Sequence, residues 1–183
     1  MLKLTNTAHT YGVVAVVLHW LVAVVVFALF GTGLYMVDLS YYDELYNSLP
    51  AWHKSVGILL GMLMLLRVVW SGLNPAPQRV PGTGAGQWQV ARIVHWLMLL
   101  LIVAIVITGY LIPTADGSAI AVFDWFSVKA VLHDLENQAD VAGELHEVLA
   151  YTLVALVCLH ALAALKHHFC DRDRTLKRML GRP

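Results

Sequence analysis

The sequence predicts an all-α fold, an integral membrane four-helix bundle that forms a single domain over residues 1–183. Hydrophobic residues make up 59% of the chain and charged residues 13%, about half the charged share of ordinary soluble domains. The mean hydropathy is +0.69. Four apolar segments reach the length of about twenty residues that a helix needs to cross a bilayer. We expect these transmembrane helices at residues 12–37, 52–73, 88–112 and 145–168.

The distribution of charge predicts the orientation of the chain, although its formal net charge is zero. Ten of the twelve basic residues lie near the N-terminus, around the connection between the second and third segments, or in the C-terminal tail. Because cytoplasmic loops are enriched in Lys and Arg, we expect both termini on the cytoplasmic side. The other two connections then face the outside, and around them lie ten of the twelve acidic residues: Asp38, Asp43, Glu44, Asp116, Asp124, Asp134, Glu136, Asp140, Glu144 and Glu147.

The first two segments each carry a histidine in an otherwise apolar run, where ionisable side chains are costly and usually functional. His19 lies near the expected cytoplasmic end of segment 12–37, and His53 at the outer end of segment 52–73. Arg67 follows His53 by fourteen residues, nearly four helical turns, and so returns to the same helix face at the cytoplasmic level. There it either pairs with an anionic group of a ligand or extends to the headgroups.

Gly57 and Gly61 follow His53 at intervals of four and eight residues and leave that face free of side chains. Such a strip suits the close approach of a flat macrocycle and, equally, plain packing against another helix. The connection at residues 74–86 is rich in Pro and Gly, which predicts an irregular loop. It lacks the strand and the Lys-Ser/Thr ending of a P-loop, so we expect no nucleotide site there.

The third segment, residues 88–112, carries His95 near its cytoplasmic start, either as a contact to a bound group or as a packed interhelical histidine. The connection that follows contains an amphipathic aromatic patch at residues 122–126, typical of the headgroup interface. His9 and His133 lie outside the apolar segments and are expected to be solvated.

The fourth segment, residues 145–168, carries His146 and His160 fourteen residues apart, on one helix face and about 21 Å apart along the axis. Two ligands at two depths suggest two stacked metal centres. In an antiparallel bundle His146 meets His53 near the outside, and His160 meets His19 near the cytoplasm. One imidazole on each side of an iron is typical of electron-transferring haem, and no Cys-x-x-Cys-His run provides covalent attachment. We therefore expect two non-covalent haem b groups with His19, His53, His146 and His160 as iron ligands.

Two other interpretations of the four histidines remain. They are either unrelated residues hydrogen-bonded between helices, or part of a zinc or copper transport path, although such paths favour clustered Cys, Asp or Glu. His167 shares the face of His160 closer to the cytoplasm, where it either passes protons to a quinone or belongs to a polar helix end.

The chain resembles the bacterial cytochrome b561 family along nearly its whole length. The residues that carry the resemblance are His19-Trp20, Trp52-His53-Lys54-Ser55-Val56-Gly57, Arg67, Arg92-Ile93-Val94-His95-Trp96, Thr108-Gly109-Tyr110, Leu145-His146-Glu147, the run from Leu159 to Phe169, and Asp171-Arg172-Asp173.

The resemblance implies the same haem ligands, a place in the bacterial inner membrane and electron exchange with membrane ubiquinone. One branch of the family, the superoxide oxidases, takes electrons from periplasmic superoxide. His167 then belongs to the quinone site, and Lys54 and Lys129 are the basic residues available to attract superoxide to the outer haem. The acidic outer connections equally suit a basic redox protein, so a non-catalytic relay or membrane-anchor subunit is the alternative. No nucleic-acid partner is expected.

Overall fold

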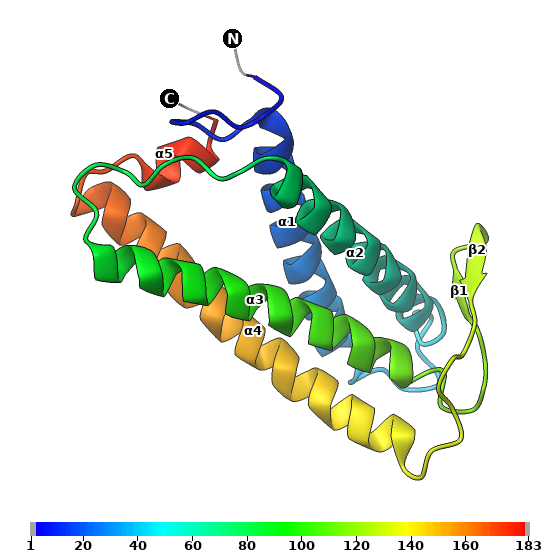
Figure 1. The fold of residues 1–183 in the computed structure, drawn as a ribbon. Coiled ribbons are helices and arrows are strands. Elements are labelled where there is room, and N and C mark those ends of the chain that lie inside the picture. The colour runs from blue at the N-terminus through cyan, green and yellow to red at the C-terminus, as the bar shows by residue number, and fades with distance from the viewer. Residues whose placement is uncertain (1–2, 182–183) are drawn as a thin grey trace.

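Four long helices make up most of the chain in the computed structural model, which describes residues 3–181 (Figure 1). Each of the four is long and apolar enough to cross a membrane, so the expected all-α membrane fold is confirmed. A short helix near the C-terminus and a two-stranded hairpin complete the fold. In chain order the elements are α1 (Val13–Met36), α2 (Ser48–Leu73), α3 (Ala85–Leu111), β1 (Ile120–Val122), β2 (Phe126–Val128), α4 (Gln138–Phe169) and α5 (Thr175–Met179).

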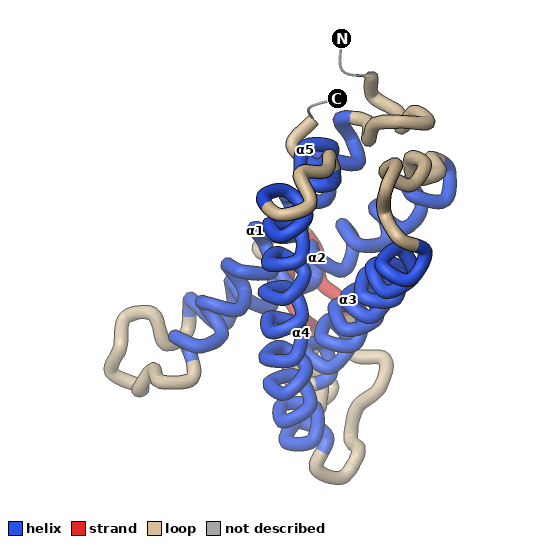
Figure 2. The backbone as a smooth tube through the Cα atoms, turned by 90° about the vertical axis from the view of Figure 1, so that its left-hand side faces the viewer, coloured by secondary structure: helices blue, strands red, loops and turns tan. Residues whose placement is uncertain are grey.

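The helices pack as two pairs, α1 with α2 and α3 with α4, and α2 also contacts α3 (Figures 1 and 2). The two ends of the chain lie at the same end of the bundle, as four membrane crossings require (Figure 1). That this end faces the cytoplasm stays a prediction from the distribution of Lys and Arg.

Six buried apolar side chains form the core, and all four long helices contribute to it. Leu60 lies midway between His53 and Arg67, and Leu153 midway between His146 and His160. The core is therefore an apolar layer between the two histidine levels. Inside a bilayer, close packing rather than removal from water holds such a layer together. Its members are Val22, Val26, Leu60, Met64, Ile102 and Leu153.

The helix boundaries differ from the expected ones most at α4, which begins at Gln138 rather than at residue 145. The added turns contain Asp140 and Glu144, which lie before the apolar run, although Asp140 suits the N-terminal turn of a helix. The amide of Gln138 fixes this start, because its Nε2 donates to the carbonyl of Leu111 at 3.0 Å and to that of Leu132 at 3.1 Å.

The connection from α3 to α4 contains the antiparallel hairpin β1–β2, where the sequence indicated only an aromatic patch. Ser55 of α2 holds the hairpin: its Oγ accepts the N–H of Phe123 at 3.0 Å. The Phe123 ring packs edge-on against Trp52, with ring centres 5.0 Å apart. The hairpin is thus docked on α2 at the end of the bundle opposite the chain termini (Figure 1).

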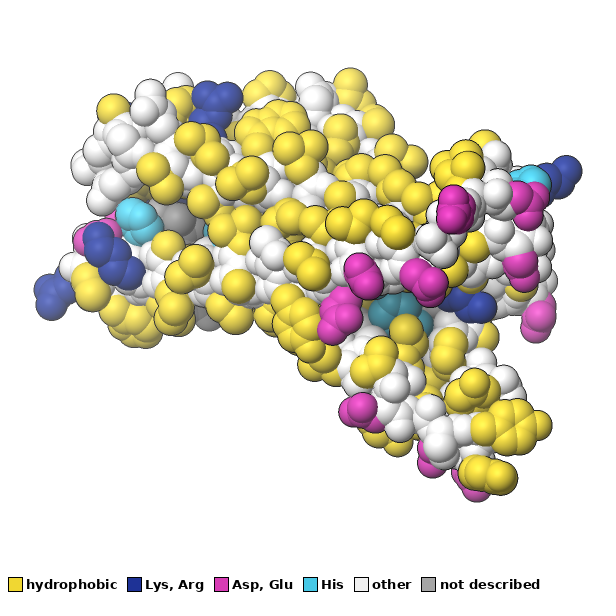
Figure 3. All heavy atoms as spheres, turned by 90° about the horizontal axis from the view of Figure 1, so that it is seen from below, with side chains coloured by type: hydrophobic (Ala, Val, Ile, Leu, Met, Phe, Trp, Pro, Cys, Tyr) yellow, Lys and Arg dark blue, Asp and Glu magenta, His cyan; other side chains and the backbone are white. Residues whose placement is uncertain are grey.

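Charge is sorted along the bundle (Figure 3). On the face shown, most Asp and Glu side chains gather toward the hairpin end, Lys and Arg side chains lie at both ends, and apolar side chains cover the middle. This is the pattern of a chain whose middle section contacts lipid and whose two ends contact water.

Candidate functional site

His53 of α2 and His146 of α4 form the pair near the hairpin, which we call the outer pair. Their ring centres lie 6.2 Å apart and their planes are inclined by 71°. Both side chains are partly buried. The structure therefore brings together the two histidines that the antiparallel order of the helices was expected to pair.

His19 of α1 and His160 of α4 form the second pair, which we call the inner pair. Their ring centres lie 6.4 Å apart with planes inclined by 58°. His95 of α3 also lies here, with its ring centre 5.1 Å from that of His160 in an edge-on arrangement. Three histidines thus meet at the inner level.

The separation within each pair fits axial ligands on opposite sides of one metal ion. An imidazole nitrogen binds a first-row metal at about 2.0 Å. Adding the distance from each nitrogen to its ring centre gives roughly 6.3 Å between the centres of two opposed ligands, on that bond length. The pairs at 6.2 and 6.4 Å match this value. The His95–His160 distance of 5.1 Å is too short for an intervening iron and favours direct packing.

The hydrogen bonds of His146 involve its Nδ1 and leave its Nε2 free for a metal. Its Nδ1 lies 2.9 Å from the carbonyl oxygen of Ile105, which can only accept, so Nδ1 carries the proton. The lone pair then remains on Nε2. Histidines that bind metals commonly donate a hydrogen bond from the N–H of their second nitrogen to the protein in this way, which fixes both the tautomer and the ring orientation.

Arg67 lies at the inner pair. Its Nη2 is 3.4 Å from Nδ1 of His19, and the side chain is half-buried. Of the two glycines, Gly61 packs against α3, since a Cβ there would come within 3.0 Å of Val106. A Cβ at Gly57 would meet no atom within 4 Å, so Gly57 alone has the open space that a flat group needs.

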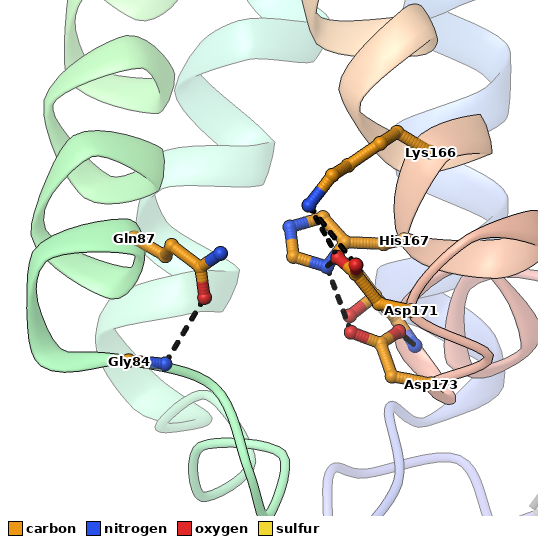
Figure 4. Close-up of polar contacts among 7 residues, drawn as sticks. Gly84, Gln87, Lys166, His167, Asp171 and Asp173 are labelled. Carbon is orange, nitrogen blue, oxygen red and sulfur yellow. Dashed lines mark hydrogen bonds and ion pairs between the residues drawn. The ribbon is translucent and has the colours of Figure 1, made fainter.

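His167 forms a polar cluster with two carboxylates of the segment after α4 (Figure 4). Its Nδ1 lies 2.8 Å from Oδ2 of Asp173 and 3.1 Å from Oδ2 of Asp171, and Lys166 pairs with Asp171 at 2.8 Å. Gln87 of α3 lies opposite the cluster (Figure 4). Between them is a cleft of about 310 Å³ lined by Pro81, Gly82, Thr83, Gln87, His167, Asp171 and Asp173.

The ionised state of Asp173 is favoured despite partial burial. Burial alone would raise the pKa of its carboxyl, but hydrogen bonds from Thr175 and the nearby His167 outweigh it and hold the pKa below the ordinary value. The Thr175 N–H donates to Asp173 Oδ1 at 2.8 Å. The sequence drew attention to His167 but not to this partner, although an Asp-x-Asp run directly after a helix that ends in histidines is a usable signal.

Lys54 and Lys129 are both exposed, one on α2 and the other just after β2. Tyr110 fixes the chain around Lys129, because its hydroxyl donates to the Lys129 carbonyl at 2.8 Å and accepts the N–H of Val131 at 2.7 Å. His133 is exposed beside Asp134, and His9 lines a cleft near the chain termini. Neither lies with the two pairs.

Comparison with known proteins gives the family of the chain. A family profile described as prokaryotic cytochrome b561 matches residues 10–182. Cytochrome b561 homolog 2 of Escherichia coli (strain K12) is 49% identical over 99% of this chain and 96% of its own length. The probable superoxide oxidase CybB of Yersinia pestis is 29% identical over 93% of this chain and 95% of its own. Cytochrome b561 homolog 1 of Escherichia coli (strain K12) is 28% identical over 71% of this chain and 73% of its own.

The described histidines fit haem, the four long helices fit a membrane, and the family match spans nearly the whole chain. The chain belongs to the prokaryotic cytochrome b561 family, as a multi-pass bacterial membrane protein that binds haem b and transfers electrons.

Proposed function

We propose that this chain holds two haem b groups, one between His53 and His146 and the other between His19 and His160, and passes single electrons between an outside donor and ubiquinone across the bacterial inner membrane. The observation that carries the proposal is the matching separation of the two pairs, 6.2 and 6.4 Å, at two levels of the bundle. Each bound haem supplies a one-electron couple.

The protein residues around the inner pair have a second task, the binding of the haem propionates. Arg67 is the half-buried cation at this level, and no acidic side chain among residues 3–181 forms an ion pair with it. A guanidinium held away from water binds a carboxylate through short charge-assisted hydrogen bonds. Arg67 would bind a propionate of a haem held at this level.

At the basic end, the cleft beside His167 provides the quinone site of the proposal. Reduction of a quinone to a quinol consumes two electrons and two protons. His167 lines this cleft together with Asp171 and Asp173, and it lies seven residues beyond His160 on the same side of α4. His167 supplies protons to the quinone, and Asp173 holds its ring in place.

The proposed donor is superoxide, which the relative from Yersinia pestis supports through its printed name. Two superoxide ions each lose one electron and leave as dioxygen, while one quinone gains two electrons and two protons. Lys54 and Lys129, both exposed near the hairpin, provide positive charge close to the outer pair.

A second candidate is an electron relay or membrane anchor for a partner redox protein. The acidic side chains that gather toward the hairpin end favour it, because they attract a basic protein and repel an anion (Figure 3). This candidate predicts slow reaction with superoxide, rapid reduction by a basic redox protein, and strong inhibition of that step by salt.

Rapid mixing of the purified protein with superoxide, then with a soluble ubiquinone, separates the two candidates. Haem reduction by superoxide, followed by reoxidation with quinone, supports the first. Haem that reacts with neither superoxide nor quinone contradicts it and leaves the relay. A matched control is Lys3→Gln, since Lys3 lies near the termini. Only Lys54→Gln and Lys129→Gln are expected to slow the reduction of haem by superoxide.

A further inference from the structure

Two Thr-Gly pairs on different helices contact the two histidines of the outer pair. On α1, the Thr32 hydroxyl lies 3.2 Å from Nδ1 of His53, and the position of a Cβ on Gly33 lies 3.5 Å from Cε1 of the same ring. On α3, the Thr108 hydroxyl lies 3.3 Å from Nδ1 of His146, and Gly109 lies under that ring. The same dipeptide thus contacts each histidine of the outer pair from a neighbouring helix.

The hydrogen bonds of the threonines determine which ring nitrogen carries the proton. A hydroxyl has one proton to donate, and Thr32 gives it to the carbonyl of Leu29 at 3.0 Å. Its oxygen can then only accept from His53, whose proton must lie on Nδ1. Thr108 likewise donates to the carbonyl of Ala104 at 2.9 Å and accepts from His146. Both rings therefore keep the lone pair on Nε2, as a metal ligand requires.

Gly109 gives the His146 ring the space to take its position. A Cβ at Gly109 would lie 2.8 Å from Cε1 and 3.0 Å from Nδ1 of His146, closer than real atoms approach. A side chain there would displace the ring. At Gly33 the equivalent distance of 3.5 Å is an ordinary contact, so an added methyl group fits without displacing His53.

The inner pair has a different arrangement. His19 Nδ1 faces the Arg67 guanidinium, which can only donate, so this nitrogen accepts and the proton lies on Nε2. The side chain of His160 makes no hydrogen bond within residues 3–181. Among the described residues, hydrogen bonds therefore set the metal-ready tautomer only at the outer pair.

We propose that Thr32 and the pair Thr108-Gly109 are positioning elements that set the tautomer and ring orientation of His53 and His146, and thereby tune the outer haem independently of the inner one. This inference rests on the assignment of a haem to the outer pair. An imidazole that donates through Nδ1 is a more basic ligand and favours ferric iron. The Thr32 hydroxyl therefore lowers the midpoint potential of the outer haem.

The two threonines differ in the size of the expected effect. His53 has Thr32 as the one hydrogen-bond partner of its ring within residues 3–181, whereas His146 also donates to Ile105. Thr32→Val is expected to raise the midpoint potential of the outer haem and weaken its binding about tenfold. Thr108→Val gives a smaller change in the same direction. Thr32→Ser, which keeps the hydroxyl, is expected to restore the wild-type potential.

The test is a redox titration of both haems, with the haem-to-chain ratio, in purified variants. The control for Thr32→Val is Thr152→Val, because Thr152 also bonds a carbonyl of its own helix, that of Val148 at 2.7 Å, but faces no histidine. The control for Gly109→Ala is Gly143→Ala, where a Cβ would meet no atom within 4 Å. Gly109→Ala is expected to lose the outer haem while Gly33→Ala and Gly143→Ala keep it.

Two failures are distinguishable. If the wild type holds both haems while Thr32→Val and Gly109→Ala match their controls in potential and haem content, the Thr-Gly inference is wrong and the two-haem assignment stands. If His53→Ala loses no haem, the outer site itself is wrong and the inference falls with it.

Discussion

Asp173 Oδ2 lies 2.8 Å from His167 Nδ1, and the backbone N–H of Asp173 also donates to the His167 carbonyl at 3.0 Å. The segment after α4 therefore folds back on the last turn of that helix and is joined to it through both backbone and side chain. A left-handed residue, Arg172 with φ of 52°, makes the reversal. The result is a histidine whose ring is oriented by a carboxylate at the edge of a cleft.

Asp173→Asn is expected to keep both haems and to slow quinone reduction by about tenfold. The carboxylate orients the His167 ring through a contact of 2.8 Å, and a tenfold loss corresponds to about 1.4 kcal/mol in the barrier. The measurement is the rate of haem reoxidation by a soluble quinone. Asp116→Asn at the other end of the bundle is the control, and an equal loss in both variants would show that the effect is not specific to the cleft.

The lowered pKa of Asp173 predicts how the C-terminal segment responds to acid. A carboxyl with a depressed pKa stabilises the folded segment above the ordinary value of about 3.9 and loses that contribution as the pH falls through the lowered value. The segment should therefore loosen below about pH 4. Protease cleavage of residues 171–181 as a function of pH measures this, and Asp173→Asn should show no such acid step.

Arg67→Met is expected to weaken binding of the inner haem by tenfold or more, because the variant lacks the half-buried cation that we propose as the partner of a propionate. The outer haem should be unaffected. Haem content and redox titration give the result. Arg92→Met is the control, since Arg92 stacks over the Trp88 ring at 4.7 Å on the outside of α3. Equal haem content in the two variants would exclude a propionate role for Arg67.

Tyr110→Phe is expected to loosen the hairpin connection without loss of haem. The phenol bridges the Lys129 carbonyl and the Val131 N–H, and each hydrogen bond of this kind contributes about 1 kcal/mol. Faster hydrogen exchange at residues 129–133 is the direct readout. If Lys129 attracts superoxide, Tyr110→Phe should also react more slowly with superoxide. Unchanged hydrogen exchange at residues 129–133 would contradict the bridging role of Tyr110.

The four helices could be predicted from the sequence because length and apolarity suffice to define a membrane span. The start of α4 could not be predicted, because its first turns contain Asp140 and Glu144 and precede the apolar run. Gln138, whose amide bonds the carbonyl of Leu111, holds these turns in place. The hairpin could not be predicted either. It is held in place by the hydrogen bond between Phe123 and Ser55, two residues that lie 68 positions apart in the chain.

The histidine pairs follow from the fourteen-residue interval, and the structure brings the expected partners together. The roles of Thr32 and Thr108 do not follow from the sequence. A threonine in a membrane helix ordinarily bonds a carbonyl one turn earlier, as both do, and only the packing of α1 on α2 and of α3 on α4 shows that each oxygen also faces a histidine.

The haem-to-chain ratio of the purified protein and of His53→Ala, with reduced-minus-oxidised spectra, tests the central claim most directly. We predict two haem b groups per chain in the wild type and one in the variant, with the remaining group keeping its b-type spectrum. A single haem in the wild type, or two haems retained in His53→Ala, would contradict the assignment of the two histidine pairs.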